Sequence, residues 1–266
     1  SISWARMLQA LYERSCMYLY ELNYPGTWLQ LENDEVRFEI EGVLRALEGI
    51  LTEAAIALSM FEESHSQRPD PRNEWDRDAE LRQQIDDEIR KEAGDDYYQN
   101  FDTYRLLSEK RMRAKKAELG ILPRSYLHKI PFIHAHTFVY AVDSFGKYLE
   151  VLQEYDEIPE EIGKCTNEFD RLLPSVRKIR NSALHIEDRS RGYGPPWEKK
   201  KGKKMEIQGF LGLSNLEGNS LCYTIDDGSY QRVEISSNVL GVLVSLANQL
   251  LASFEWSGPA RIEPSY

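Results

Sequence analysis

Residues 132–154 read FIHAHTFVYAVDSFGKYLEVLQE, and this stretch decides the fold class. Large apolar side chains repeat through it at a spacing of about 3.5 residues. Such a repeat is typical of a helix at the centre of a bundle or at a seam between two helices. The sequence therefore predicts a buried central helix here. The repeating side chains are Phe138, Val142, Phe145, Leu149 and Leu152.

Three helical patterns precede the central segment, over residues 3–22, 33–51 and 101–119. Each has apolar residues three and four positions apart, the spacing of an amphipathic helix packed on a core. Residues 62–100 differ, because they contain 13 acids against 6 bases and only a thin apolar stripe. There we expect a loop followed by a solvated, peripheral helix.

A mixed pattern follows the central segment. We expect a helix from about residue 160 to 188, kinked or interrupted at Pro174, whose ring cannot continue a regular helix. A last apolar helix is expected from Val239 to about Phe254. Between them, turn residues separate three short apolar runs, which indicates a β-meander. The predicted strands are Met205–Leu213, Leu221–Ile225 and Tyr230–Ile235, with turns at 218–219 and 226–228.

These patterns predict a mainly α protein with one helical domain over residues 1–266. In this prediction, residues 1–120 supply N-terminal helices, including the acidic peripheral segment 62–100. Residues 130–255 form the core, and a small antiparallel β-meander at 205–235 is inserted before the last helix.

Composition favours a cytoplasmic protein. Three scattered cysteines form no CxxC pair, which fits a reducing compartment. No run of about 18 apolar residues predicts a membrane span, and the first residues do not resemble a signal peptide. Phosphate-binding and hydrolase motifs of the GxxxxGK[ST], GxGxxG and GxSxG types are lacking. No metal or cofactor is expected, since His134 and His136 would point to different sides of a helix.

One stretch combines residues suited to phosphate chemistry: RLLPSVRKIRNSALHIEDR, residues 171–189. On a helix its apolar residues fall on one side, and Arg177, Asn181 and His185 fall opposite them. Arg180 flanks this polar stripe, about 140° around from His185. Guanidinium groups hold and neutralise phosphate, and an imidazole transfers protons near neutral pH. From these residues alone, a surface helix with a merely solvated polar face remains the alternative.

Arg180-Asn181-Ser-Ala-Leu-His185 resembles the signature of the HEPN superfamily, in which an Arg and a polar residue precede a His on a bundle helix. The resemblance implies an α-helical bundle, often a homodimer, and a metal-independent ribonuclease of toxin–antitoxin or antiviral-defence systems. Arg180, Asn181 and His185 would then be catalytic. His185 would transfer the proton, Arg180 would stabilise the phosphorane, and Asn181 would orient the phosphate or His185.

The expected product of such an enzyme is a 2′,3′-cyclic phosphate with a free 5′-hydroxyl. Two copies of the motif would face each other across a dimer cleft. Two other interpretations stay open. The chain could be a non-catalytic HEPN-like adaptor that binds a protein or nucleotide partner, or an unrelated helical scaffold.

Charge is unevenly distributed along the chain. The formal net charge is −11, which argues against broad nucleic-acid binding. Residues 171–204, however, contain eleven Lys and Arg against three acids, so they carry +8 and the remainder carries −19. We therefore expect a focused RNA site, with an antitoxin or regulatory protein as a further partner. The expected RNA-binding residues are Arg177, Lys178, Arg189, Arg191, Lys199, Lys200 and Lys201.

Overall fold

The computed structural model describes residues 17–66, 71–156 and 158–266. It is mainly helical, with 63% of the chain in helices and several small antiparallel sheets, as the sequence predicts. The chain divides into two compact units. The second unit is Ser64–Ile130, and the first combines the residues on either side of it. This division differs from the expected subdivision into 1–120 and 130–255, because the first long helix packs with elements that follow residue 131. Most of the predicted helix 3–22 lies outside the described residues.

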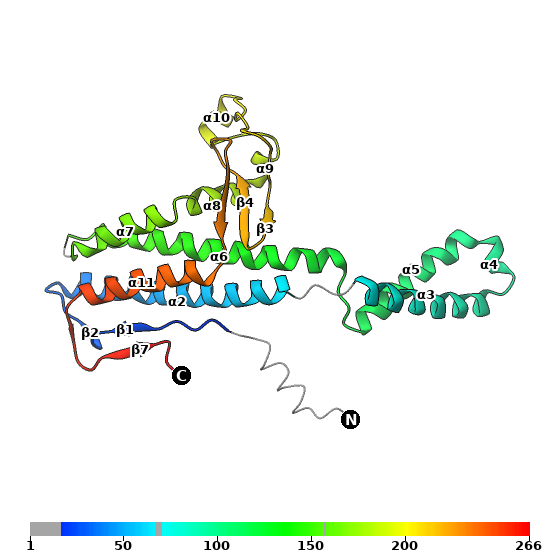
Figure 1. Cartoon of the computed structure of the whole chain (residues 1–266), viewed down its shortest axis with the longest axis horizontal. Coiled ribbons are helices and arrows are strands. Elements are labelled where there is room, and N and C mark those ends of the chain that lie inside the picture. The colour runs from blue at the N-terminus through cyan, green and yellow to red at the C-terminus, as the bar shows by residue number, and fades with distance from the viewer. Residues whose placement is uncertain (1–16, 67–70, 157) are drawn as a thin grey trace. The chain divides into compact units, whose positions relative to one another are not determined.

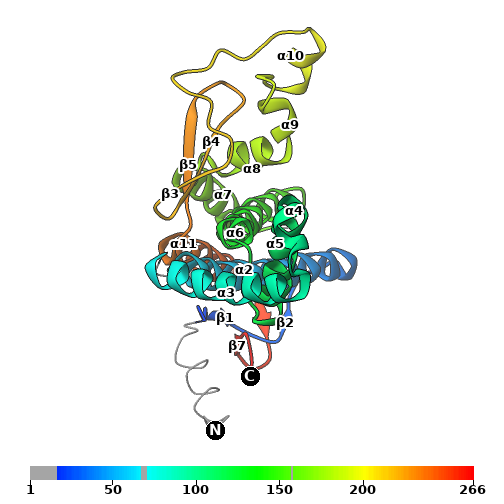
Figure 2. The same ribbon diagram turned by 90° about the vertical axis from the view of Figure 1, so that its right-hand side faces the viewer.

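The first unit is built around the central helix that the sequence predicts. In Figures 1 and 2, α6 lies between the layer of α2 and α11 on one side and α7 and α8 on the other. Strands β1 and β7 lie beyond the α2–α11 layer. The helices are α2 (Asp34–Ser66), α6 (Arg124–Leu152), α7 (Glu161–Leu172), α8 (Val176–Leu184), α9 (Ile186–Arg189), α10 (Pro196–Lys200) and α11 (Ser237–Ser253).

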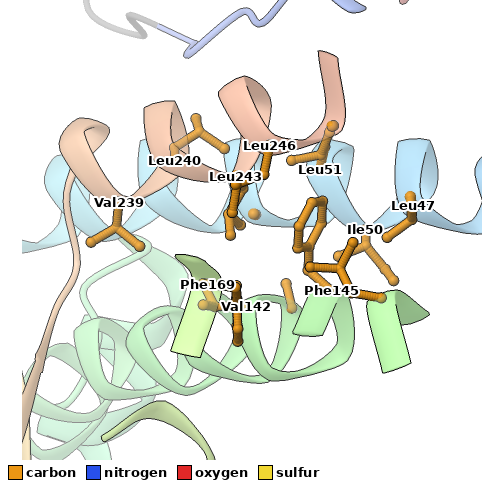
Figure 3. Packing of buried hydrophobic residues seen from close by; sticks show 14 of the residues in the cluster. Leu47, Ile50, Leu51, Val142, Phe145, Phe169, Val239, Leu240, Leu243 and Leu246 are labelled. Atoms are coloured by element: carbon orange, nitrogen blue, oxygen red, sulfur yellow. The ribbon is translucent and has the colours of Figure 1, made fainter. Parts of the chain in front are cut away.

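The predicted apolar repeat of α6 is fully buried. Phe138, Val142, Phe145, Leu149 and Leu152 all have no solvent-exposed surface. Figure 3 shows side chains of α2, α6, α7 and α11 filling the space between these helices. The packing depends on a missing side chain as well, since a Cβ atom at position 146 would collide with the ring of Phe169. Burial of this repeat therefore stabilises the first unit.

Two pairs of short strands join the beginning and end of the described chain, which the sequence did not predict. Strand β1 (Leu22–Tyr24) pairs antiparallel with β7 (Arg261–Glu263), and β2 (Trp28–Leu29) pairs antiparallel with β6 (Trp256–Ser257). The Tyr24 and Trp256 rings meet edge to face at 5.5 Å. Two- and three-residue strands have no detectable alternation, so sequence periodicity could not reveal them.

The β-meander exists, but its first strand was predicted in the wrong place. The sheet consists of β3 (Asn215–Glu217), β4 (Ser220–Thr224) and β5 (Tyr230–Glu234), all antiparallel. The predicted strand Met205–Leu213 is irregular, and Gly209 inside it has a φ of 97°, outside the extended region. The predicted turn at Gly218-Asn219 is confirmed, since Glu217 pairs with Ser220 across it.

The second unit contains a helical hairpin, formed by α3 (Pro71–Ala93), α4 (Asp96–Gln99) and α5 (Phe101–Glu118) (Figure 1). Its apolar contacts join α3, α4 and α5 in one small cluster. The side chains in this small cluster are Leu81, Ile85, Ile89, Ala93, Tyr97, Tyr104, Leu107 and Met112. Two cations of α5 are paired with acids of α3: Arg111 bonds Glu92, and Lys116 bonds Asp78.

Candidate functional site

The predicted helix from residue 160 to 188 is divided into three helices. Pro174 falls between α7 and α8, as the sequence predicts. A second interruption at His185 was not predicted. His185 has φ −112° and ψ 36°, and its amide donates to the carbonyl of Asn181 in the last turn of α8. The prediction that one helix continues through His185 to Asp188 is therefore wrong, because α8 ends at Leu184.

The arginines of α8 converge on a buried carboxylate, Asp143 of α6. Its side chain is 1% exposed. Arg177 Nε donates to Asp143 Oδ1 at 3.0 Å, and Arg180 Nε lies 3.2 Å from Asp143 Oδ2. Lys147, one turn further along α6, places its Nζ 2.9 Å from the same oxygen. A charge removed from water is tolerated only with such close partners, so Asp143 positions the polar side of α8 against α6.

A second, exposed carboxylate completes the pairing of Arg177. The Nη1 atom of Arg177 donates to both oxygens of Glu150, at 2.8 and 3.1 Å. Burial opposes the charge of Arg177, but its hydrogen bonds to Asp143 and Glu150 raise the pKa of the guanidinium above its ordinary value. Arg177 is therefore held in place as a permanent cation, mainly by bonds within the protein.

Arg180 pairs with one carboxylate, where Arg177 pairs with two, and part of its guanidinium stays available. Its Nη1 atom donates to the amide oxygen of Asn181 at 3.0 Å, so the structure brings these two predicted residues together. Its Nη2 atom makes no hydrogen bond to any described residue. The side chain is 26% exposed. The cluster of Arg177, Arg180, Lys147, Asp143 and Glu150 has three cations and two carboxylates, which leaves one net positive charge.

His185 lies beyond this cluster, with its side chain 48% exposed. The nearest charged group to its Nδ1 is Glu187 Oε1, at 3.9 Å, which is too long for a hydrogen bond. Within the described residues of one chain, the imidazole of His185 makes no hydrogen bond or ion pair with the side chains of Arg180 and Asn181. The imidazole is therefore accessible, while the guanidinium and the amide are fixed nearby on α8.

A row of polar side chains continues along the same side of α6. Tyr140 is one turn before Asp143, and burial raises the pKa of its hydroxyl, an effect that the charge of Arg180 partly offsets. One turn further back, His136 Nε2 lies 2.6 Å from the hydroxyl of Tyr223 on β4. Helix α8 also packs against β4 and β5, so the β-meander helps to hold the candidate site.

Two of the expected RNA-binding residues instead stabilise the loop that follows the motif. Arg189 is 3% exposed and donates to the carbonyl oxygens of Tyr193 and Gly194, at 2.8 and 2.6 Å. Burial lowers the pKa of this guanidinium from its ordinary value, and nearby carboxylates oppose that shift. Lys199 donates to both oxygens of the buried Asp188, at 2.6 and 2.8 Å. Arg189 therefore cannot contact RNA without unfolding the loop.

Arg191 is also paired, although its side chain is 55% exposed. Its Nη2 atom donates to Asp188, and its guanidinium lies 5.7 Å from the centre of the Tyr193 ring. A second cation also lies against the Tyr193 ring, since Lys204 Nζ is 3.8 Å from the ring centre. Tyr193 therefore packs on cations of its own chain.

Three expected cations remain exposed and without an ion pair among the described residues: Lys178, Lys200 and Lys201. Lys178 lines an open pocket of about 540 Å³ together with Trp197, whose side chain is 63% exposed. Acids at positions 226 and 227 line the same pocket. These three lysines and Trp197 are therefore exposed groups of the basic segment that no ion pair engages among the described residues.

The sequence pattern missed the acid that organises the site. Asp143 interrupts the apolar face of the central helix, and an acid at a core position signals a buried charge that needs a partner. Its pairing with α8 spans 34 residues, so spacing along the chain could not identify that partner. Among the residues that the structure describes, no three His, Cys, Asp or Glu side chains gather as metal ligands.

No protein-family model, curated protein or solved structure matches this chain. The site must therefore be interpreted from its own geometry. None of the helices in the described part of the chain combines the length and apolarity required to span a bilayer.

Proposed function

We propose that the chain is a HEPN-like, metal-independent endoribonuclease in a toxin or antiviral-defence role. The observation that carries this proposal is the state of Arg180. Asp143 and Asn181 hold its guanidinium, Nη2 remains without a partner in the described residues, and an exposed imidazole follows on the next turn. This combination suits a phosphodiester, which needs a fixed cation and a mobile proton.

In this mechanism Arg180 donates from Nη2 to a non-bridging phosphate oxygen, and Asn181 helps to orient the group. The RNA 2′-hydroxyl attacks phosphorus, and the bond from phosphorus to the 5′-oxygen breaks. His185 takes the proton from the 2′-hydroxyl or supplies one to the leaving oxygen. The products are a 2′,3′-cyclic phosphate and a free 5′-hydroxyl, so no water is consumed.

A homodimer would complete the site. Since no hydrogen bond joins the His185 imidazole to Arg180 within the described residues of one chain, the second copy would bring its own motif to the opposite side of the phosphate. Lys178, Lys200, Lys201 and the exposed Trp197 would guide the RNA strand towards the cleft. The net positive charge of the Asp143 cluster supports anion binding at the same place.

The test is cleavage of a structured RNA in EDTA by the wild type, His185→Ala and a control. His128→Ala is the control, since it removes an exposed imidazole from a different helix. We expect His185→Ala to lose at least about a hundredfold in rate, the ordinary contribution of a general acid or base, and His128→Ala to retain activity. Equal cleavage by His185→Ala, or loss of wild-type cleavage in EDTA, would refute the mechanism.

The second candidate is a non-catalytic adaptor that uses the same surface. The observation that favours it is that much of the basic segment is paired internally, which reduces the charge available to RNA. An adaptor would cleave no RNA even as wild type. It would instead lose its protein or nucleotide partner when Asn181 is replaced by Ala, as measured by co-purification with that partner.

A further inference from the structure

The second unit contains a pocket that lies outside the α8 site. It has a volume of about 510 Å³, within the range of small-molecule sites. Its walls come from the first turns of α3, the last turns of α5 and the start of α6. Every lining residue belongs to the unit Ser64–Ile130, so the pocket is formed within that unit.

One wall of the pocket is apolar. Ile121, Leu122 and Pro123 form the connection between α5 and α6, and Tyr126 follows on the first turn of α6. Leu122 is 45% exposed and Tyr126 is 60% exposed. An aromatic ring and an exposed leucine that line the same concave site provide apolar surface for a flat group.

The lining of the pocket also carries more cations than the protein neutralises. Four cations line it against two acids, Glu74 and Asp78. Lys116 Nζ bonds Asp78 at 2.5 Å, and Arg124 Nη2 lies 3.3 Å from Glu74 Oε2. Glu74 and Asp78 Oδ2 are paired with these two cations, whereas Asp78 Oδ1 has no hydrogen-bond partner among the described residues, and the four cations and two acids of the lining leave a net charge of +2.

The remaining two cations are guanidinium groups. Arg113 is exposed and has no hydrogen bond or ion pair within the described residues. Arg77 Nε is 3.9 Å from Asp78 Oδ1, too far for a hydrogen bond. Two guanidinium forks in one pocket, whose lining carries a net positive charge, are suited to bind a phosphate group.

We propose that this pocket binds a nucleoside monophosphate, with the phosphate on Arg77 and Arg113 and the base against Tyr126 and Leu122. The cations and the aromatic wall lie in one pocket and match the two ends of such a ligand. Free phosphate would leave the apolar wall uncovered, and a fatty carboxylate would use the two guanidinium groups less fully.

Isothermal titration calorimetry of the whole chain tests the proposal with 5′-AMP as the probe. Inorganic phosphate, adenosine and octanoate are the comparison ligands. We expect 5′-AMP to bind at least about tenfold more tightly than each of them, since only 5′-AMP uses both sides of the pocket. Octanoate binding as tightly as 5′-AMP would replace the nucleotide by a fatty anion, and no 5′-AMP binding at millimolar concentration would overturn the proposal.

Variants locate the binding. Arg113→Gln should weaken 5′-AMP about tenfold, the value of one charge-assisted contact. Lys110→Gln is the matched control, because it removes one exposed charge from α5 outside the pocket. Tyr126→Ala should weaken 5′-AMP while leaving phosphate binding unchanged. Equal losses in Arg113→Gln and Lys110→Gln would refute the site. His185→Ala should bind 5′-AMP normally, so this result is independent of ribonuclease activity.

Discussion

Three aspartates in this protein are each flanked by cations, and they differ in burial. Asp143 on α6 is 1% exposed, Asp188 on α9 is 10% exposed, and Asp78 on α3 is 33% exposed. The first holds the arginines of α8, the second holds the loop of residues 189–204, and the third neutralises a lysine in the hairpin pocket. The role of a cation in this chain therefore depends on how deeply its acidic partner is buried.

This difference in burial distinguishes cations that are held in ion pairs within the protein from cations that remain available to a ligand. Around Asp143, Arg177 is paired with two carboxylates and Arg180 with one, and the Nη2 atom of each makes no hydrogen bond to a described residue. In the hairpin pocket, Arg113 has no partner in the described part of the chain. Residues of the same type therefore serve packing in one region and remain available to a ligand in another.

The largest expected effect is that of Asp143→Asn. This change leaves two guanidiniums and a lysine beside a neutral amide, so the free energy of unfolding should fall by about 3–5 kcal/mol. Urea denaturation measures the change. Glu150→Gln is the control, since Glu150 contacts the same Arg177 but is 49% exposed, and it should cost under about 1 kcal/mol. Similar values for the two variants would show that burial of Asp143 does not control the cluster.

An intermediate, pH-dependent effect is expected for Asp188→Asn. Hydrogen bonds from Lys199, together with those from Arg191, lower the pKa of Asp188 below its ordinary value of 3.8. A lowered pKa in the folded state means that the charged carboxylate stabilises the loop above pH 3.8 and loses this effect as the pH falls through the lower folded value. Asp188→Asn should therefore loosen the loop at neutral pH, and the difference from wild type should vanish in acid.

Hydrogen exchange of the loop amides measures this effect. The amides of Tyr193 and Met205 are suitable reporters, since they bond the carbonyls of Asp188 and Gly192. A difference between Asp188→Asn and wild type that persists unchanged well below pH 3.8 would mean that the charge of Asp188 does not hold the loop.

The smallest expected effect is that of Asp78→Asn. Its partner Lys116 is 28% exposed and Asp78 is 33% exposed, so the pair should contribute less than about 1 kcal/mol to stability. The same change removes one acid from the hairpin pocket, and 5′-AMP should then bind more tightly. Urea denaturation and calorimetry measure the two quantities. If Asp78→Asn lowered the free energy of unfolding as much as Asp143→Asn does, burial of the aspartate would not determine the size of the effect.

The sequence alone determined the helical class, the central helix and the interruption at Pro174. Each depends on local rules, because apolar periodicity and the proline ring act within a few residues. The same rules located the turn at Gly218-Asn219. They failed at Met205–Leu213, where an apolar run has the composition of a strand but Gly209 takes a positive φ.

Only the tertiary structure decided which residues share a site. The partner of Arg177 lies 34 positions away on α6, and β1 finds its partner β7 near the other end of the chain. The basic segment had a net charge of +8 in sequence, yet folding pairs Lys199 with Asp188 and buries Arg189 against carbonyl groups. Periodicity indicates which side of a helix is buried. Whether a charged side chain on the polar side is paired or exposed depends on which residues the fold places next to it.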